Sequence, residues 1–307
     1  MTRTQYTTTT RGLDRTSPAL RLFEKAKKLG VWNPSDIDFT QDRADWLGLS
    51  DLEREVLLHL TALFQAGEEA VTLDLLPLIM VIAKEGRLEE EMFLTTFLWE
   101  EAKHVDFFGR FLTEVAVDAG DLTRFRSPMY DILFNDKLPN ALQALQTDSS
   151  TKAQVVASVT YNMIVEGVMA ETGYQAFFAA MDRNDIMPGL RHGIYKLKQD
   201  ESRHIAYGVY LLSRLISAEP DLWQTAQDTL NSLLPLAIGI ITELFAMYPT
   251  MPFGLDQNEF TTYAMSQFQA RFMRLMSAQS ASLADVGAIA NQLIEAESYT
   301  FCAMRRL

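Results

Sequence analysis

The chain of 307 residues is poor in cysteine and histidine, with one of the former and four of the latter. The single thiol, Cys302, excludes an intrachain disulfide and a thiolate cluster for zinc or an iron–sulfur centre. A lone cysteine fits a reducing compartment, so we expect a cytoplasmic protein. Any metal site must therefore use carboxylate oxygens and imidazole nitrogens as ligands.

Positive charge is also scarce, because 27 Lys and Arg face 40 Asp and Glu, a formal net charge of -13. This field repels nucleic acid and anionic membranes, so we expect neither a nucleic-acid partner nor membrane insertion. The most apolar run, Leu233–Met247, is too short to span a bilayer and contains Glu243, which predicts a buried helix. Residues 1–18 are expected to form a loose arm, because Met1–Arg15 lacks the apolar core of a secretory signal.

Alternating β-branched runs are scarce, and apolar residues recur with the period of a helix, so the predicted fold class is all-α. No low-complexity linker interrupts residues 1–307, which favours a single domain. We expect a Pro- and Asp-rich connection over Asp121–Pro139 and a short helical piece around Leu142. The expected longer helices run from Ser50 towards Ala83 with a break or bend near Pro77, from Gly86 to before Gly120, from Ser150 to Met181, from Pro188 through Leu212, from Asp221 to Met247, from Gln257 to Ala278 and from Leu283 to Met304.

What the chain does contain is the pattern Glu-x-x-His, twice. Glu101-Ala-Lys-His104 and Glu201-Ser-Arg-His204 lie in two of these predicted helices. Residues three apart lie on one face of a helix, about one turn from each other. Each Glu and His can therefore bind one ion together.

A lone glutamate in an apolar helical stretch precedes each copy of this pattern. These are Glu68 and Glu166, and a carboxylate buried among such neighbours is costly unless a cation or proton neutralises it. The offsets between the halves are 166 − 68 = 98, 201 − 101 = 100 and 204 − 104 = 100, which indicates an approximate duplication. The sequence therefore predicts six ligands for two metals: Glu68, Glu101, His104, Glu166, Glu201 and His204.

Simpler explanations apply to the parts of this pattern. A single glutamate is more often an exposed or salt-bridged helix residue, and one Glu-x-x-His alone is weak evidence. The remaining histidines, His59 and His192, have no such partners and are expected at the surface or in a helix cap. For the full set, carboxylate-rich ligands with one imidazole per ion favour manganese and iron over copper, and oxygen activation over hydrolysis.

On these residues the chain resembles the ferritin-like superfamily, specifically the ribonucleotide reductase small subunit and its ligand-binding oxidase relatives, over residues 20–280. The resemblance implies a ferritin-like four-helix bundle core with additional flanking helices, and it matches the six ligands one for one. Asp200 matches an aspartate that accepts a hydrogen bond from the first-site histidine, here His104. A solvated helix carboxylate is the alternative for Asp200.

One position departs from the conventional small subunits. Phe108 stands one turn beyond His104, where those proteins have the tyrosine that stores a radical. Small subunits without this tyrosine use a manganese–iron pair, so Phe108 does not choose between the relatives. The segments 66–72 and 158–167 look like the ligand-binding oxidases.

In that family the resemblance implies an ether cross-link between Val71 and Tyr161, made when the metals activate dioxygen. Val71 is three residues after Glu68 and shares its helix face. Tyr161 is five residues before Glu166, roughly 140° away in an α-helix, so a local distortion or an approach from the pocket edge is required. Ordinary core packing is the alternative for both.

The resemblance further implies manganese at Glu68, Glu101 and His104 and iron at Glu166, Glu201 and His204, with a di-iron centre as an alternative. The two half-sites have the same ligand types, so the sequence itself does not assign the metals. A long-chain fatty acid bridging the metals and a homodimer are also implied. An apolar tunnel for such a guest has candidate lining residues, with ordinary core as the alternative: Phe97, Phe177, Phe178, Leu234, Ile238, Ile241 and Phe245.

Two functions follow from these patterns. The first is a dioxygen-dependent oxidase that performs a two-electron oxidation and binds an apolar ligand. The second is a ribonucleotide reductase small subunit of the manganese–iron type without a tyrosyl radical. The second needs a radical relay and a flexible docking tail, and the terminal residues Tyr299–Leu307 show no acidic tail.

Overall fold

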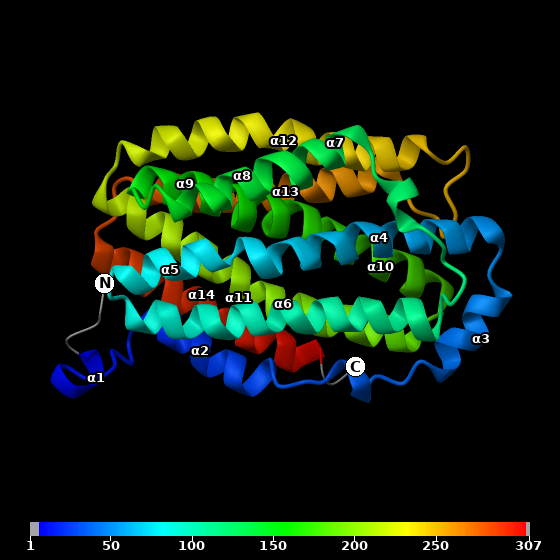
Figure 1. Cartoon of the computed structure of the whole chain (residues 1–307), viewed down its shortest axis with the longest axis horizontal. Helices are drawn as coiled ribbons and strands as arrows, with labels where there is room; N and C mark the ends of the chain where they lie inside the picture. Colours follow the sequence, from blue (N-terminus) through cyan, green and yellow to red (C-terminus); the bar gives the residue numbers. More distant parts are fainter. Residues whose placement is uncertain (1–5, 305–307) are drawn as a thin grey trace.

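The computed structural model describes the backbone of residues 6–304 and the side chains of residues 6–295. Over these residues the chain forms helices joined by turns, with no strand, which confirms the all-α prediction. Most of the long helices run along the long axis of the molecule (Figure 1). Helix α12 (Leu222–Ala246) lies along one edge and α2 (Pro18–Leu29) along the opposite edge.

Four helical rods contain the predicted ligands. They are α4 (Asp51–Asp74), α6 (Leu88–Glu114), the continuous run α9 (Thr151–Ser158), η5 (Val159–Ala170) and α10 (Glu171–Asn184), and α11 (Pro188–Ala218). Helix α4 packs on α6, and η5 packs on α11, so each Glu-x-x-His helix lies beside a lone-Glu helix. The predicted helices therefore form and pair as a four-helix core.

Local signals explain where these helices begin. The side chain of Ser50 accepts a hydrogen bond from the Glu53 N–H, and a Glu53 carboxylate oxygen accepts one from the Ser50 N–H at 2.8 Å, which starts α4 with a capping box. Helix α4 ends at Asp74, and α5 (Leu76–Lys84) follows with Pro77 in its first turn. The predicted break near Pro77 is confirmed, because proline has no N–H for the helical ladder.

The predicted loop over 121–139 is mostly helical, so that prediction is wrong. Proline residues begin helices here instead of ending them, since proline fits the first turn, where N–H groups have no partner. Ser127 caps one start by accepting a bond from the Tyr130 N–H at 3.4 Å, and Pro128 follows it. The segment contains η2 (Leu122–Phe125), α7 (Pro128–Tyr130), the π-helix η3 (Asp131–Lys137), α8 (Leu138–Gln143) and η4 (Ala144–Gln146).

The N-terminal region contains elements that the sequence analysis did not anticipate: α1 (Thr7–Thr10), α2, η1 (Pro34–Asp36) and α3 (Thr40–Gly48). Helix α2 packs on α6 and α11. The expected loose arm contacts the bundle at Arg11, which donates two hydrogen bonds to Glu89 at 3.0 and 3.1 Å, and at Asp14, whose N–H also binds Glu89. Residues 1–5 lie outside the described residues, and the single-domain organisation stays a prediction.

The C-terminal helices α12, α13 (Gln257–Ala278) and α14 (Leu283–Met304) occur where they were predicted. Helix α12 is long and apolar enough to cross a membrane, a property that it shares with the core helices of many soluble proteins. Only 28% of its apolar window is buried. The prediction of a buried helix is therefore wrong for most of α12, which is only partly buried. Its Glu243 accepts a bond from the Met129 N–H at 3.1 Å. The side chain of Cys302 and the predicted tailless end Tyr299–Leu307 lie outside the described side chains.

His59 contradicts the prediction of a surface or capping residue, whereas His192 is exposed. The His59 side chain is 1% exposed, stacks on Phe125 at 4.8 Å between ring centroids and has Nδ1 2.9 Å from the Tyr248 hydroxyl. Burial lowers the pKa of His59 to about 4. Its position on α4 faces inward, and a neutral imidazole is tolerated there because its polar atom has a partner.

We expect His59 to make the free energy of unfolding depend on pH. The unfolded chain binds a proton near pH 6.5 and the folded chain only near pH 4, so stability is full above pH 6.5 and decreases by about 3 kcal/mol as the pH falls to 4. Denaturant unfolding at several pH values should show this slope reduced in His59→Gln and retained in His192→Gln. Equal slopes in the two variants would contradict the assignment.

Candidate metal centre

The six predicted ligands converge in the middle of the bundle. Potential ligand atoms form two groups, each with all its atoms within 4.8 Å of one another. Glu101 and Glu201 belong to both groups, and every member is buried. The groups are Glu68, Glu101, His104 and Glu201, and Glu101, Glu166, Glu201 and His204.

Both histidines present the same ring nitrogen to this cluster. His104 Nδ1 lies 3.4 Å from a carboxylate oxygen of Glu68 and 3.4 Å from one of Glu201. His204 Nδ1 lies 3.2 Å from Glu101 and 3.9 Å from Glu166. Most of these contacts are long for hydrogen bonds. They are the spacing expected when ligand atoms surround a common point.

Several of these atoms have no hydrogen-bond partner among the described residues. They are Glu101 Oε2, Glu166 Oε1, Glu201 Oε2 and His204 Nδ1. Buried polar atoms are normally satisfied, so four unsatisfied atoms in one place indicate a site for cations. Oxygen donors with one imidazole per group fit two ions of the manganese and iron type.

The electrostatics of the cluster support the same conclusion. Burial, followed by repulsion from neighbouring glutamates, raises the pKa of Glu68 and of Glu166 well above its usual value. Burial acts in the same direction on Glu101, but hydrogen bonds with His104 and His204 hold its pKa well below the usual value. Protons therefore compensate the buried charge when no ion is present, and an incoming cation would displace them.

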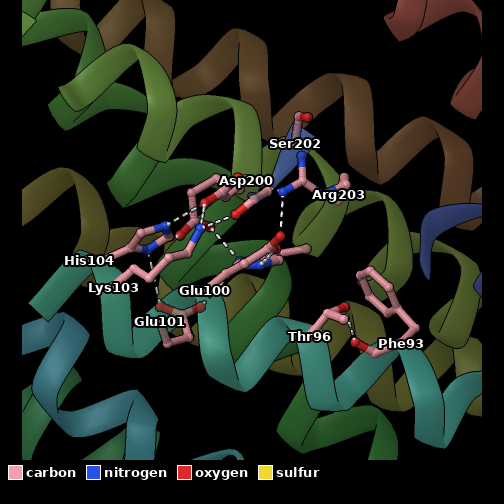
Figure 2. A network of polar contacts seen from close by, with 12 residues as sticks. Phe93, Thr96, Glu100, Glu101, Lys103, His104, Asp200, Ser202 and Arg203 are labelled. Atoms are coloured by element: carbon pink, nitrogen blue, oxygen red, sulfur yellow. Dashed lines mark hydrogen bonds and ion pairs between the residues drawn. The ribbon is translucent and has the colours of Figure 1, made fainter. Parts of the chain in front are cut away.

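Asp200 lies behind His104, on the side away from the cluster (Figure 2). Its Oδ2 is 3.4 Å from His104 Nε2, and it also accepts bonds from Lys103 Nζ at 3.0 Å and Trp32 Nε1 at 2.8 Å. Asp200 is fully buried, so the alternative of a solvated helix carboxylate is excluded. The predicted contact with His104 is present, and it can set the orientation of that ring.

Glu100, which the sequence did not lead us to predict, has the same relation to the other histidine. Its Oε2 is 2.8 Å from His204 Nε2, and its Oε1 accepts a bond from Arg203 at 2.5 Å. Arg203 also donates to Asp200 at 2.5 Å, so one guanidinium links the two carboxylates (Figure 2). A side chain at Gly30 would overlap Glu100 Oε1, so this close approach requires glycine.

A signal for Glu100 was present in the sequence. Residues 100–104 and 200–204 share the pattern acid-Glu-x-base-His at the same offset of 100 that relates the ligands. Extending the repeat by one residue on the N-terminal side of each motif would have paired Glu100 with Asp200. The lysine and arginine of the two motifs, Lys103 and Arg203, also correspond.

Tyr161 reaches the cluster because its helix is not a regular α-helix. The η5 segment is a π-helix, whose i to i+5 hydrogen bonds place residues five apart one turn from each other. Tyr161 can therefore share a face with Glu166, and its hydroxyl donates to Glu101 Oε1 at 2.9 Å. The local distortion that the sequence analysis required is present.

Val71 and Phe108 are both buried beside the cluster. Val71 is 3% exposed and lines the same pocket as Tyr161. Phe108 is the residue noted above in place of a radical-storing tyrosine. Its ring packs on that of Phe64, with the ring centroids 5.4 Å apart. A phenyl ring has no hydrogen-bonding group, so the half-site of Glu68 and His104 has an apolar neighbour at position 108.

An apolar pocket of about 970 Å³, counting its opening to solvent, ends at the cluster. Glu68, Glu101, Glu166 and Glu201 lie in its wall, and most of the remaining lining is aliphatic or aromatic. Among the predicted lining residues, Ile241 and Phe245 are correct. The prediction is wrong for Phe97, Phe177, Phe178, Leu234 and Ile238, which contribute nothing to the wall; Phe97, for example, stacks on His204 at 3.6 Å.

Comparison with known proteins agrees with this geometry. Residues 18–277 match the family model described as ribonucleotide reductase, small chain. The structure is similar to an R2-like ligand-binding oxidase with aerobically reconstituted Mn/Fe cofactor, at 37% identity and a TM-score of 0.85, covering 89% of this chain and 98% of the other. A tyrosine-to-phenylalanine mutant of such an oxidase matches at 36% identity and a TM-score of 0.86, covering 89% and 99%.

Glu100 should stabilise the metal-free protein as well as orient His204. Glu100→Gln removes the charge that Arg203 and His204 face, so we expect the free energy of unfolding to decrease by about 1.5–3 kcal/mol. Glu69→Gln is the matched control, because Glu69 is exposed on the neighbouring helix α4. Urea unfolding of both variants checks this, and equal stability would show that the buried network contributes little.

Proposed function

The chain belongs to the ribonucleotide reductase small-chain family, and within it we propose that the protein is a ligand-binding oxidase that uses dioxygen at a manganese–iron centre. The observation that supports this most is the convergence of four buried carboxylates and two imidazoles, several of their atoms unsatisfied, at the end of an apolar pocket. Dioxygen is apolar and can enter such a pocket. The similar oxidases named above contain this cofactor.

Each half of the chain would hold one ion. Glu68, Glu101 and His104 are the proposed manganese ligands, and Glu166, Glu201 and His204 the proposed iron ligands, with two irons as the alternative loading. When bound, the two redox-active ions supply electrons for dioxygen reduction. Asp200 and Glu100 orient the two imidazoles by accepting bonds at their outer nitrogens.

The residues Val71 and Tyr161 are the proposed site of an oxidative cross-link. The Tyr161 hydroxyl already donates to Glu101, which gives its proton an acceptor 2.9 Å away. A carbon–oxygen bond between the two side chains forms when Val71 loses one C–H hydrogen and Tyr161 its O–H hydrogen. Dioxygen is the oxidant that takes up the two electrons and two protons.

The pocket suits a long-chain fatty acid or a similar apolar ligand. A carboxylate at the closed end would meet the bound cations, and an alkyl chain would contact the aliphatic and aromatic wall contributed by α4, α12 and Phe260. A two-electron oxidation of such a guest is the proposed reaction. A homodimer remains part of the proposal on family grounds alone, and a cytoplasmic location rests on the single cysteine.

A second function, the ribonucleotide reductase small subunit, is favoured by one observation. Trp32, Asp200 and His104 form a connected chain, with contacts of 2.8 Å and 3.4 Å, that leads from a partly exposed indole to the centre. Such a chain can serve as a radical relay. The cross-link separates the two functions, because it would consume the oxidising equivalents inside the pocket.

After aerobic loading with manganese and iron, peptide mass spectrometry should find the Val71 and Tyr161 peptides joined and lighter by two hydrogens. Tyr161→Phe removes the hydroxyl oxygen that forms the bond, so this variant should give separate peptides. Protein loaded without oxygen should also stay unlinked, since no oxidant is present. Unlinked peptides in fully loaded, aerobic wild-type protein would favour the reductase function.

Filling the pocket should exclude the ligand. Ala176 is buried in the pocket wall, so Ala176→Phe places a ring in the space of the guest. Organic extraction of the folded protein, followed by mass spectrometry, should recover a long-chain carboxylic acid from the wild type and much less from this variant. Ala270→Phe is the control, because Ala270 is exposed on α13 outside the pocket. Equal recovery from both variants would place the ligand elsewhere.

A further inference from the structure

The two half-sites have the same ligands but different neighbours. Granted the metal centre proposed above, we propose that Asn162 is a positioning residue through which the second half-site, that of Glu166 and His204, discriminates iron from manganese. Asn162 acts through Glu166 and touches no ion itself. Because the two half-sites have identical ligand types, a difference in metal preference must come from the residues around the ligands.

The internal repeat shows where the two halves differ. Four residues before the lone glutamate, the first half has Phe64 and the second has Asn162. Four residues after the histidine, the first half has Phe108 and the second has Gly208. An apolar pair in one half thus corresponds to an amide and an absent side chain in the other.

In the second half these positions form a hydrogen-bonded series. The Ser158 hydroxyl donates to Asn162 Oδ1 at 2.8 Å, and Asn162 Nδ2 donates to Glu166 Oε2 at 2.9 Å. Because its carbonyl faces Ser158, the amide must present its N–H to the carboxylate. All three side chains are at most 3% exposed, so water does not compete for these bonds.

Gly208 provides the space for this arrangement. A Cβ at position 208 would overlap the Cβ and Cγ atoms of Asn162. Any larger residue on α11 would therefore displace the amide from Glu166. At the equivalent place in the first half, Phe108 packs on Phe64, and neither side chain can donate a hydrogen bond to Glu68.

The consequence concerns the freedom of the two terminal carboxylates. Glu166 is held at Oε2 by the amide, while Oε1, which has no partner, is left for an ion. Glu68 has a phenyl ring where Glu166 has the amide, so this restraint on its rotation is missing. Divalent manganese is the larger of the two ions, so a carboxylate that cannot rotate adapts to it less well than a free one, whereas donor type alone ranks iron above manganese equally at both sites. We therefore assign the stronger preference for iron to the second half-site.

Anomalous diffraction at the manganese and iron edges tests this in crystals of protein loaded without oxygen from an equal mixture of both ions. In the wild type the iron-to-manganese ratio should be higher at the second site. Asn162→Leu keeps the branched shape and the number of side-chain heavy atoms but removes the donor, so we expect this ratio to decrease, by up to the roughly tenfold loss of affinity that follows when a partner of a metal ligand is removed. The ratio at the first site should not change.

Two further variants keep the test decisive if Asn162→Leu folds poorly. Ser158→Ala frees the amide to rotate and should decrease the second-site ratio in the same direction, by less. Phe64→Leu is the matched control, because it alters packing beside Glu68 without removing a donor, and the second-site ratio should be unchanged. If both sites fill and the ratio is the same in all variants, the role of Asn162 is wrong. If neither site binds metal even in the wild type, the metal centre itself is wrong.

Discussion

Repulsion among four buried carboxylates is the constraint on which the rest of the structure depends. Glu68, Glu101, Glu166 and Glu201 share one small volume with only two imidazoles to oppose them. Burial and mutual repulsion raise the pKa of Glu68 and Glu166, so an ion-free centre must retain protons. Two divalent cations satisfy the same charge and also the unpaired oxygen atoms. The fold can keep these acids in its core because it is built to contain ions.

The approximate duplication explains how one chain builds a two-ion site and how it departs from symmetry. The repeat supplies matching ligands and the matching outer acids Glu100 and Asp200. It differs on the pocket side, where Val71 corresponds to Met169 and Tyr161 to Leu63, all four lining the pocket. The side chains able to form a cross-link thus occur once. The proposed cross-link would therefore have one location inside a symmetric set of ligands.

The sequence predicted the helices of the core and the set of six side chains that converge inside it, because helical periodicity and i, i+3 spacing are local properties. It could not predict the path of residues 121–146, where Pro128 begins a helix instead of ending one. The orientation of Tyr161 also lay beyond local rules, since it depends on the π-helix Val159–Ala170, which residue type alone does not specify. His59 and the pocket wall were misjudged for the same reason: which face of a helix is buried, and against what, is decided by tertiary contacts.

The claim that six side chains bind two ions is tested most directly by counting the ions. Native mass spectrometry of the chain, loaded without oxygen with manganese and iron and freed of excess metal, should show a mass increase of two ions per chain. Because Glu101 belongs to both ligand groups, Glu101→Ala should abolish most of that increase. A wild-type chain that retains no ion, or a Glu101→Ala chain that retains both, would contradict the account.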